Sequence, residues 1–218
     1  MGLYKNILFP ILRRVTDPED AHDRAVRSLS LLQASPPGRW VLRRMAGPAP
    51  LKPVEVCGIL FTNPVGIAAG FDKDVRIARA LGELGFGHVE VGTLTPRPQP
   101  GNPRPRIFRL PEDKALINRM GFPNEGVRAA LPRLRKLAEQ KGTLRIGVSL
   151  GKQKETPLEE AAGDYIEVMR AVYPYADYLA VNISSPNTPG LRELQGTGYL
   201  KNLCRSLRTK TSVWQIGK

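Results

Sequence analysis

Small polar side chains gather at residues 181–190, VNISSPNTPG, where a run typical of a buried strand ends. The preceding residues, YADYLA, are aromatic and apolar, as in the core of a sheet. Asn182 and Asn187 carry primary amides, which suit a ring with alternating C=O and N–H groups. Ser185 offers a hydroxyl for proton transfer, although a free hydroxyl is a weak base and needs help from its surroundings. The alternative is an Asn-rich turn that closes the strand.

The segment AAGFDKD, residues 68–74, also follows an apolar run. Ala69 and Gly70 are small enough for the backbone to approach a flat ring closely. Lys73 is suited to offsetting negative charge on a reduced ring or to holding a carboxylate. The alternative for this segment is a connecting turn with a solvated lysine.

Two further segments carry candidate groups. EVGTLTPRPQPGNPRPRIFRL places Thr93 at a strand end, and its prolines exclude a helix or a central strand, which leaves a lid or a rigid connector. LINRMGF places Asn118 after an apolar turn, where its amide can reach a pocket. His22 and His88 are isolated, so we expect solvated or packed histidines and no metal site.

An alternation of strands and helices positions these groups. The expected strands are NPVGIAAG, HVEVGTLT, RIGVSLG and YLAVNIS, and the expected helices cover residues 74–84, 124–140, 157–171 and 197–208. This order predicts an α/β fold with parallel strands and crossover helices. A (β/α)8 TIM barrel and a doubly wound sheet both place ligands at the carboxyl ends of such strands. We favour the barrel because no GxGxxG motif follows the first strand.

Residues 1–50 read as an N-terminal helical segment that ends in the proline-rich joint GPAPLKP. YKNILFPILRRV has one apolar face, interrupted by Pro10, and SPPGRWVLRRM suggests a short helix. Between them, Asp17 is a candidate N-cap with Pro18 at the first helical position. These helices are apolar on one side and rich in arginine on the other. They form either a cap on the main domain or a surface pair that enters a bilayer interface.

Residues 51–218 are too few for a complete barrel, which needs about 250 residues. We count about four βα units, so we expect a TIM barrel truncated at half its length. The chain then ends in TSVWQIGK, which has no helix stop or cap. Either the chain is a fragment, or this tail replaces the second half.

The amino-acid composition limits the classes of molecule that the protein is expected to bind. The net charge is +13, with 33 Lys and Arg against 20 Asp and Glu, which favours nucleic acid, anionic lipid or a phosphate-bearing cofactor. The positive residues are scattered and lack a recognition motif with interleaved aromatics, so we expect no nucleic acid. The two cysteines lie in no motif, which gives no support for a disulfide framework or a zinc site. No run approaches the ~18 apolar residues of a membrane span.

Four segments in this order, NPVGIAAGFDKD, GTLTPRPQPGNPRPRIFRLPED, INRMGF and NISSPNTPGLRELQG, resemble the dihydroorotate dehydrogenase family, flavin enzymes of pyrimidine synthesis. The resemblance runs from the N-terminal helices to about residue 208. The segment DPEDAH, and serine rather than cysteine at the base position, resemble the class 2, quinone-reducing type. The resemblance implies oxidation of dihydroorotate to orotate with FMN and a quinone in UMP biosynthesis. It also implies a monomer, peripheral on an anionic membrane surface: the inner face of a bacterial cytoplasmic membrane, or the mitochondrial inner membrane.

The resemblance also implies roles for single residues. Ser185 matches the catalytic base that takes a proton from C5 of dihydroorotate as hydride passes from C6 to the flavin, and Lys73 matches a lysine shared by FMN and substrate. The substrate site is matched by Asn118, Arg119, Met120, Gly121, Phe122, Asn182 and Asn187. The FMN site is matched by Ala69, Gly70, Phe71, Asp72, Thr93, Ser149 and again Asn182. His22 and Arg109 resemble residues of the quinone tunnel.

The sequence departs from the family in two respects. Ser149 stands where the family usually has asparagine, so an FMN contact is lost or bridged by water. The second half of the barrel would supply a flavin-facing lysine, a Thr/Asn substrate segment and a glycine-rich phosphate site. We therefore expect the 218-residue chain to be impaired or inactive. The alternatives are a non-catalytic fragment of that enzyme, or another flavin-dependent TIM-barrel dihydropyrimidine oxidoreductase.

Overall fold

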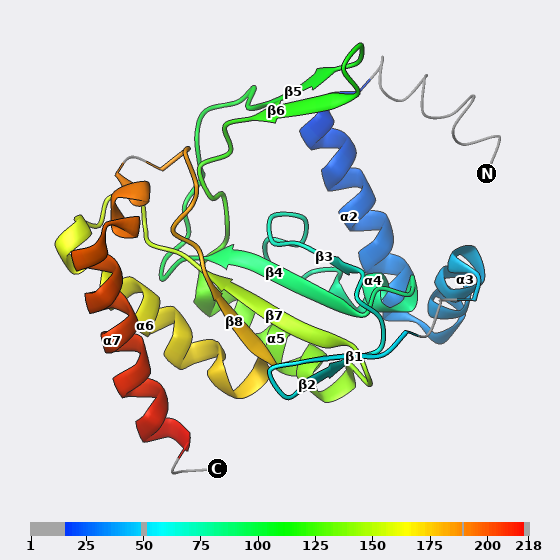
Figure 1. Ribbon diagram of the computed structural model, residues 1–218. Helices are drawn as coiled ribbons and strands as arrows, with labels where there is room; N and C mark the ends of the chain where they lie inside the picture. The colour runs from blue at the N-terminus through cyan, green and yellow to red at the C-terminus, as the bar shows by residue number, and fades with distance from the viewer. Residues whose placement is uncertain (1–15, 49–51, 189, 216–218) are drawn as a thin grey trace.

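The computed structural model describes residues 16–48, 52–188 and 190–215, with side chains described as far as residue 209. A four-stranded parallel sheet of order β3-β4-β7-β8 forms its centre (Figure 1). Its strands are β3 Gly66–Ile67, β4 His88–Leu94, β7 Arg145–Leu150 and β8 Tyr178–Val181. Helices α4 (Ala78–Glu83), α5 (Val127–Gln140) and α6 (Ala161–Val172) lie between successive strands. The predicted α/β fold with parallel strands and crossover helices is therefore confirmed.

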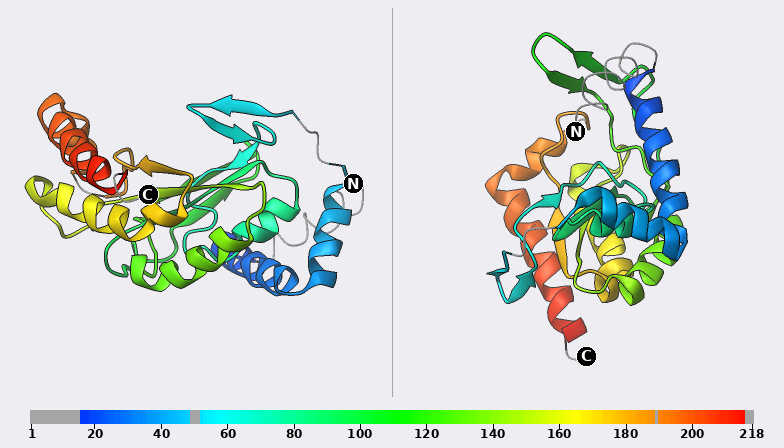
Figure 2. Two further views of the ribbon diagram at one scale, coloured as in Figure 1. Left: turned by 90° about the horizontal axis from the view of Figure 1, so that it is seen from below. Right: turned by 90° about the vertical axis from the view of Figure 1, so that its right-hand side faces the viewer.

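The core lies where the two inner strands meet the helices. Val89 and Val91 of β4 pair with Ile146 and Val148 of β7, and all four side chains are completely buried. Strands of a parallel sheet that is covered by helices carry such apolar runs. Helices α5 and α6 lie on the same face of the sheet, as the left view of Figure 2 shows. The site described below lies at the carboxyl ends of these strands.

Helices α2 (Pro18–Ala34) and α3 (Pro36–Ala46) precede the sheet, and their starts follow from their capping residues. The Asp17 carboxylate accepts a hydrogen bond from the Glu19 amide at 2.8 Å, and Pro18 occupies the first turn, as predicted. The Ser35 hydroxyl accepts one from the Gly38 amide at 3.2 Å and begins α3. The helix predicted in YKNILFPILRRV lies outside the described residues.

Several predicted boundaries differ from the structure. The helix expected at residues 74–84 begins only at Ala78, because the preceding loop is held by Asp72. The buried Asp72 carboxylate accepts hydrogen bonds from the amides of Arg76 at 2.7 Å and Ile77 at 2.9 Å. The helices expected from 124 and 157 begin as α-helices at Val127 and Ala161. A 3₁₀ turn, η2 (Leu158–Glu160), comes before α6, and another, η3 (Tyr173–Tyr175), comes after it.

The last helix is longer than the sequence suggested. Helix α7 is Thr197–Gln215, so it continues beyond residue 208 into the TSVWQ of the tail. A 3₁₀ helix, η4 (Leu191–Gln195), comes before α7.

Two antiparallel hairpins were not predicted. Strands β1 (Val54–Val56) and β2 (Ile59–Phe61) form one, and β5 (Ile107–Leu110) and β6 (Ala115–Asn118) form the other. The β5–β6 hairpin begins at Ile107, just after Pro105 of the proline-rich segment. The prolines do keep this segment out of the central sheet, as expected. The β5–β6 hairpin instead stands beside the carboxyl ends of the parallel strands (Figure 1).

Two glycines provide a matched test of the packing. A Cβ at Gly87 would lie 2.2 Å from the Asn63 carbonyl oxygen, whereas a Cβ at Gly163 in α6 meets nothing within 4 Å. We expect Gly87→Ala to lower the free energy of unfolding by about 1–3 kcal/mol because the backbone must shift. Gly163→Ala should raise it by about 0.5–1 kcal/mol through helix propensity. Urea denaturation of both variants checks these opposite signs, and equal signs would contradict the packing described.

Candidate functional site

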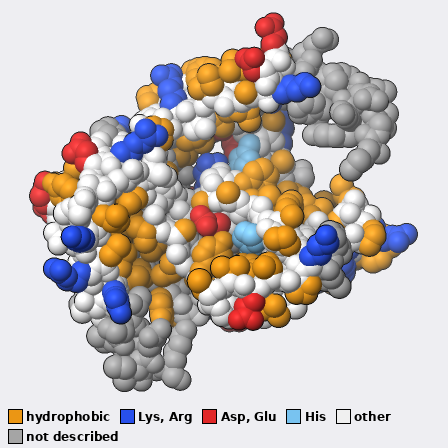
Figure 3. Space-filling view, viewed as in Figure 1, with side chains coloured by type: hydrophobic (Ala, Val, Ile, Leu, Met, Phe, Trp, Pro, Cys, Tyr) orange, Lys and Arg blue, Asp and Glu red, His pale blue; other side chains and the backbone are white. Residues whose placement is uncertain are grey.

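A cavity of about 650 Å³ lies at the carboxyl ends of the parallel strands. The turn after β3, Thr93 of β4 and Asn182 after β8 contribute to its wall. The β5–β6 hairpin and the segment 118–123 form another side, and Pro18 and His22 of α2 complete it. The molecule is visibly hollowed between the hairpin and the sheet (Figure 3). The site therefore lies where ligands bind in parallel α/β folds.

Most residues proposed from the sequence line this cavity. They are His22, Ala69, Gly70, Phe71, Lys73, Thr93, Asn118, Met120, Gly121, Phe122, Asn182, Ser185 and Asn187. Segments as far apart in the chain as those of His22 and Asn187 are thus brought to one place.

Asn182 is the centre of a hydrogen-bonded row of polar groups. Its amide nitrogen donates to the Thr93 hydroxyl at 2.9 Å, and that hydroxyl lies 2.9 Å from the Ser149 hydroxyl. Its amide oxygen accepts from the amide and the hydroxyl of Ser184, both at 3.2 Å. The Tyr165 hydroxyl donates to the Asn182 carbonyl oxygen at 2.9 Å. Both the backbone and the side chain of Asn182 are therefore fixed before any ligand arrives.

The loop that carries Ser185 is held from behind. The Ser185 hydroxyl oxygen accepts a hydrogen bond from the Asn187 amide at 3.2 Å. Arg192 and Gln195 of η4 donate to the carbonyl oxygens of Ser184 and Ile183, each at 3.1 Å. The Ser185 hydroxyl keeps a second lone pair, which is free to accept a proton or a further hydrogen bond.

Lys73 supplies the positive charge of the cavity wall. Burial is the main cause that lowers the pKa of Lys73, against the attraction of the nearby Glu19 carboxylate. Burial likewise lowers the pKa of His22, and the Lys73 ammonium lowers it further. The His22 ring meets the Phe71 ring edge-on, with centroids 5.1 Å apart. A partly desolvated ammonium beside a neutral imidazole favours an anionic ligand.

The lowered pKa of Lys73 gives a pH dependence with a definite sign. Between the folded pKa and the ordinary value of 10.5, the unfolded chain binds the proton more strongly, so stability from this group rises with pH. We expect the stability difference between Lys73→Met and the parent chain to shift in favour of the parent as pH rises towards 10.5. Urea midpoints from pH 7 upward measure this, with the exposed Lys154→Met as control. A difference independent of pH would contradict it.

Four predicted residues lie outside the cavity lining. Asp72 uses its carboxylate to hold the loop before α4, and Ser149 reaches the cavity only through Thr93. The Arg119 guanidinium lies 5.9 Å from the centre of the Phe108 ring and donates to the Pro105 carbonyl oxygen. Arg109 donates to the Thr16 carbonyl oxygen at 2.5 Å, just before α2. These four side chains therefore support the walls of the cavity or lie beside it.

The most buried ion pair beside the cavity was missed from the sequence. The buried Arg106 side chain donates from Nε and Nη2 to both oxygens of the buried Glu19 carboxylate, at 2.6–3.1 Å. Its remaining nitrogen donates to the carbonyl oxygens of Pro100 and Asn102. This pair joins α2 to the β5–β6 segment. The one local signal was that Arg106 lies between Pro105 and the apolar residues Ile107 and Phe108.

Two other supporting side chains were also missed. The Gln99 amide donates to the carbonyl oxygens of Gly121 and Phe122, at 3.2 and 3.0 Å, and so holds one cavity wall. The amine of Lys152 is buried and donates to the Gln153 carbonyl oxygen at 2.7 Å. Burial lowers the pKa of Lys152. Its only sequence signal is a lysine directly after the strand RIGVSLG.

Within the described ranges, every helix is too short or too polar to cross a membrane.

Most of the chain matches one known protein family. The family described as dihydroorotate dehydrogenase matches residues 52–215. A protein of Clavibacter sepedonicus named dihydroorotate dehydrogenase (quinone) is 52% identical over 205 residues, which cover 92% of this chain and 59% of that protein. A protein of the same name from Acidithiobacillus ferrooxidans is 48% identical over 207 residues, covering 94% of this chain and 55% of that protein.

Solved structures agree with these relatives. The Eimeria tenella DHODH in complex with ferulenol has a TM-score of 0.76 and 38% identity, covering 93% of this chain and 54% of that one. The ligand-free form from the same organism has a TM-score of 0.73 and 40% identity, covering 88% and 53%. The chain thus spans between half and two thirds of the length of the relatives it matches.

Proposed function

Because this chain belongs to the dihydroorotate dehydrogenase family, we propose that the protein oxidises dihydroorotate to orotate in pyrimidine biosynthesis, with FMN as cofactor and a quinone as electron acceptor. The observation that carries the proposal is the convergence of three amides, one hydroxyl and one ammonium on a single cavity: Asn118, Asn182, Asn187, Ser185 and Lys73. A pyrimidine ring with a carboxylate matches these donors and acceptors.

The fold supports the same proposal. Strand order β3-β4-β7-β8 follows the order of the chain, without the reversal that a doubly wound sheet has at its ligand site. Successive strands of a (β/α)8 barrel pair in this way. We therefore assign the four strands to such a barrel.

The cavity also suits FMN. Ala68, Ala69 and Gly70 give a wall of small residues against which a flat ring can lie, and Gly70 adopts φ +99°, a conformation that favours glycine. Thr93 and Asn182 offer polar groups at its edge, and Lys73 offers a positive charge. When bound, FMN would supply the redox chemistry, as acceptor of the hydride from C6 of dihydroorotate and as donor of electrons to the quinone. Ser149 supports this wall through Thr93 rather than by direct contact.

Ser185 has the role of catalytic base in this proposal. Its hydroxyl oxygen takes the proton from C5 of dihydroorotate through the lone pair that the Asn187 amide leaves free, while its own hydroxyl proton passes to solvent. Asn118, Asn182 and Asn187 orient the pyrimidine through its C=O and N–H groups, and Phe122 closes the apolar side. Lys73 attracts the substrate carboxylate and stabilises the negative charge that develops on the flavin ring during the reaction.

In this proposal the quinone binds, and the membrane is contacted, on the side formed by α2, α3 and the β5–β6 hairpin. His22, Ile107 and Leu116 line the cavity there, and Arg109 binds the backbone just before α2. On α2 and α3 several apolar side chains are exposed, Leu31 by 76%, Trp40 by 57% and Met45 by 71%. Arg44 lies 5.7 Å from the centre of the Trp40 ring. Exposed apolar residues beside arginines suit peripheral binding to an anionic bilayer.

Flavin spectroscopy tests this function. Purified protein should carry bound FMN, anaerobic dihydroorotate should bleach its absorbance, and a quinone should restore it. Protein whose bound flavin fails to bleach with dihydroorotate would refute the proposal. Flavin measured on the 218-residue chain alone tests the separate expectation that this chain is impaired.

A further inference from the structure

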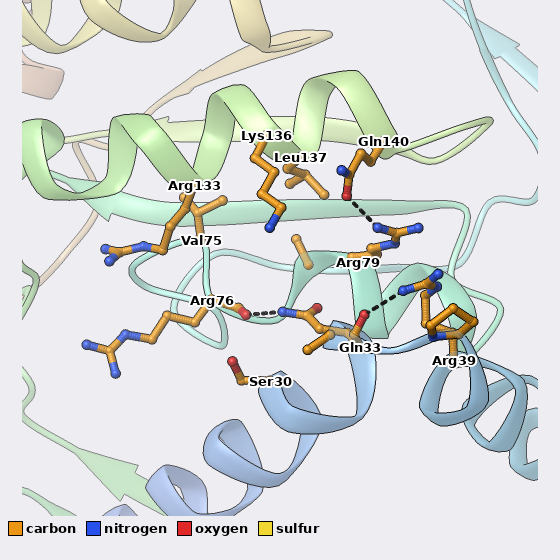
Figure 4. Close-up of a pocket in the computed structure, with 13 residues that line it drawn as sticks. Ser30, Gln33, Arg39, Val75, Arg76, Arg79, Arg133, Lys136, Leu137 and Gln140 are labelled. Carbon is orange, nitrogen blue, oxygen red and sulfur yellow. Dashed lines mark hydrogen bonds between the residues drawn. The ribbon is translucent and has the colours of Figure 1, made fainter.

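A second cleft, of about 720 Å³, lies between α2 and α3 on one side and α4 and α5 on the other (Figure 4). It shares no lining residue with the cavity at the strand ends. In the chain, α4 lies between β3 and β4, and α5 lies between β6 and β7. We refer to this second cleft as the basic cleft.

The lining of the basic cleft carries charge of one sign. Its cationic side chains are Arg39, Arg76, Arg79, Arg133 and Lys136, and among the described residues that line it there is neither Asp nor Glu. A concave surface lined by one sign of charge focuses the potential and attracts counter-ions. The cleft is therefore suited to an anion.

Most of these cations are held from outside the cleft. Arg39 and Arg79 lie 3.7 and 4.0 Å from the Glu83 carboxylate. Arg76 and Arg133 pair with the Glu125 carboxylate, so all four arginines have an acidic partner outside the lining. Such partly exposed pairs contribute little stability, so little free energy is lost when one of these arginines turns to another anion. Lys136 is different, because none of the ion pairs in the described part of the chain includes it. Its amine extends from α5 into the cleft (Figure 4).

The floor of the basic cleft is apolar and its shape is fixed. Val75, Ala78 and Leu137 form part of the lining and are buried. The Gln33 side chain joins α2 to α4, since its amide nitrogen donates to the Arg76 carbonyl oxygen and its amide oxygen accepts from the Ala80 amide. The Ser30 hydroxyl points into the same space from α2 (Figure 4). An anion with an organic body fits this surface better than a bare ion does.

We propose that the basic cleft binds a phosphate monoester, with the phosphate held by Lys136 and Arg79 and the organic part on Val75 and Leu137. A phosphate monoester carries about −1.5 to −2 charges at pH 7 and offers three acceptor oxygens. Guanidinium groups bind such oxygens in pairs, and an ammonium binds them as a point charge. The cleft volume lies in the range of about 300–1,000 Å³ found for small-molecule sites. This site is independent of the proposed oxidation of dihydroorotate.

Titration calorimetry with phenyl phosphate and with inorganic phosphate tests the site on the 218-residue chain. We expect saturable binding of one phenyl phosphate, tighter than inorganic phosphate because of the apolar floor. Lys136→Ala should weaken it about tenfold, since a charge-assisted contact is lost. The matched control is Arg128→Ala, an exposed cation on α5 outside the cleft lining, which should change affinity less than twofold. Equal affinities of the two variants, or no saturable binding, would overturn the proposal.

A second arm identifies the source of the phosphate. Phosphatidylcholine vesicles with and without phosphatidic acid are added to the same chain. Displacement of phenyl phosphate only by the phosphatidic acid vesicles supports the site and assigns it to a lipid headgroup. Retention of phenyl phosphate supports the site and assigns it to a soluble ester. Displacement by pure phosphatidylcholine as well would overturn the phosphate specificity.

Discussion

Ser185→Ala is expected to lower kcat of the flavin-loaded protein for dihydroorotate about 10²- to 10⁴-fold, the usual contribution of a positioned base. The hydroxyl lies in the cavity wall together with Asn182 and Asn187, and its loop is held by Arg192 and Gln195. Alanine removes the proton acceptor and leaves those supports in place. The chemical step should therefore suffer far more than KM does.

Single-turnover bleaching of the flavin by dihydroorotate measures this step directly. The matched control is Ser184→Ala, because that neighbouring hydroxyl is exposed and lies outside the cavity lining. Its loss removes one hydrogen bond to the Asn182 amide oxygen, so the rate should change only a few-fold. Ser185→Cys keeps a group that can accept a proton and should recover part of the rate. Similar rates for Ser185→Ala and Ser184→Ala would exclude Ser185 as the base.

Arg106→Ala is expected to lower the free energy of unfolding by about 3–5 kcal/mol, because it leaves the buried Glu19 carboxylate without its main partner. Arg104 provides a control with the same partner, since its Nη2 lies 3.0 Å from Glu19 Oε1. The Arg104 side chain is 53% exposed, so Arg104→Ala should cost about 0–1 kcal/mol. Urea denaturation compares the two, and equal losses would contradict the importance of burial.

The same pair predicts a loss of stability in acid. Hydrogen bonds from Arg106 are the main cause that lowers the pKa of Glu19 below its ordinary value of 4.5. A carboxylate with a lowered folded pKa stabilises the protein above the unfolded value, and this contribution disappears as pH falls through the folded pKa. Below pH 4.5 the parent chain should therefore lose stability faster than Arg106→Ala does. Parallel slopes for the two chains would show that the pair makes no such contribution.

The sequence was sufficient to predict those features that depend on a single short segment of the chain. Apolar runs followed by glycine or polar residues marked the parallel strands, and Asp17 with Pro18 marked the start of α2. The polar groups of VNISSPNTPG were expected at a strand end, and the cavity at the strand ends contains Asn182, Ser185 and Asn187. Periods, caps and turn residues act over a few positions along the chain, so they can be read from the sequence directly.

Only the tertiary structure determined which side chains contact one another. Glu19 and Arg106 are 87 positions apart, and their pairing depends on how α2 packs beside the β5–β6 hairpin. Packing likewise turns the Asp72 carboxylate to the loop before α4, buries Lys73 and gathers the cations of the basic cleft. Sequence pattern identified the parallel strands, the helices between them and the polar residues at the strand ends, but not the two hairpins. Burial and long-range contact depend on the whole chain at once, so partners, pKa directions and the second cleft emerged only from the fold.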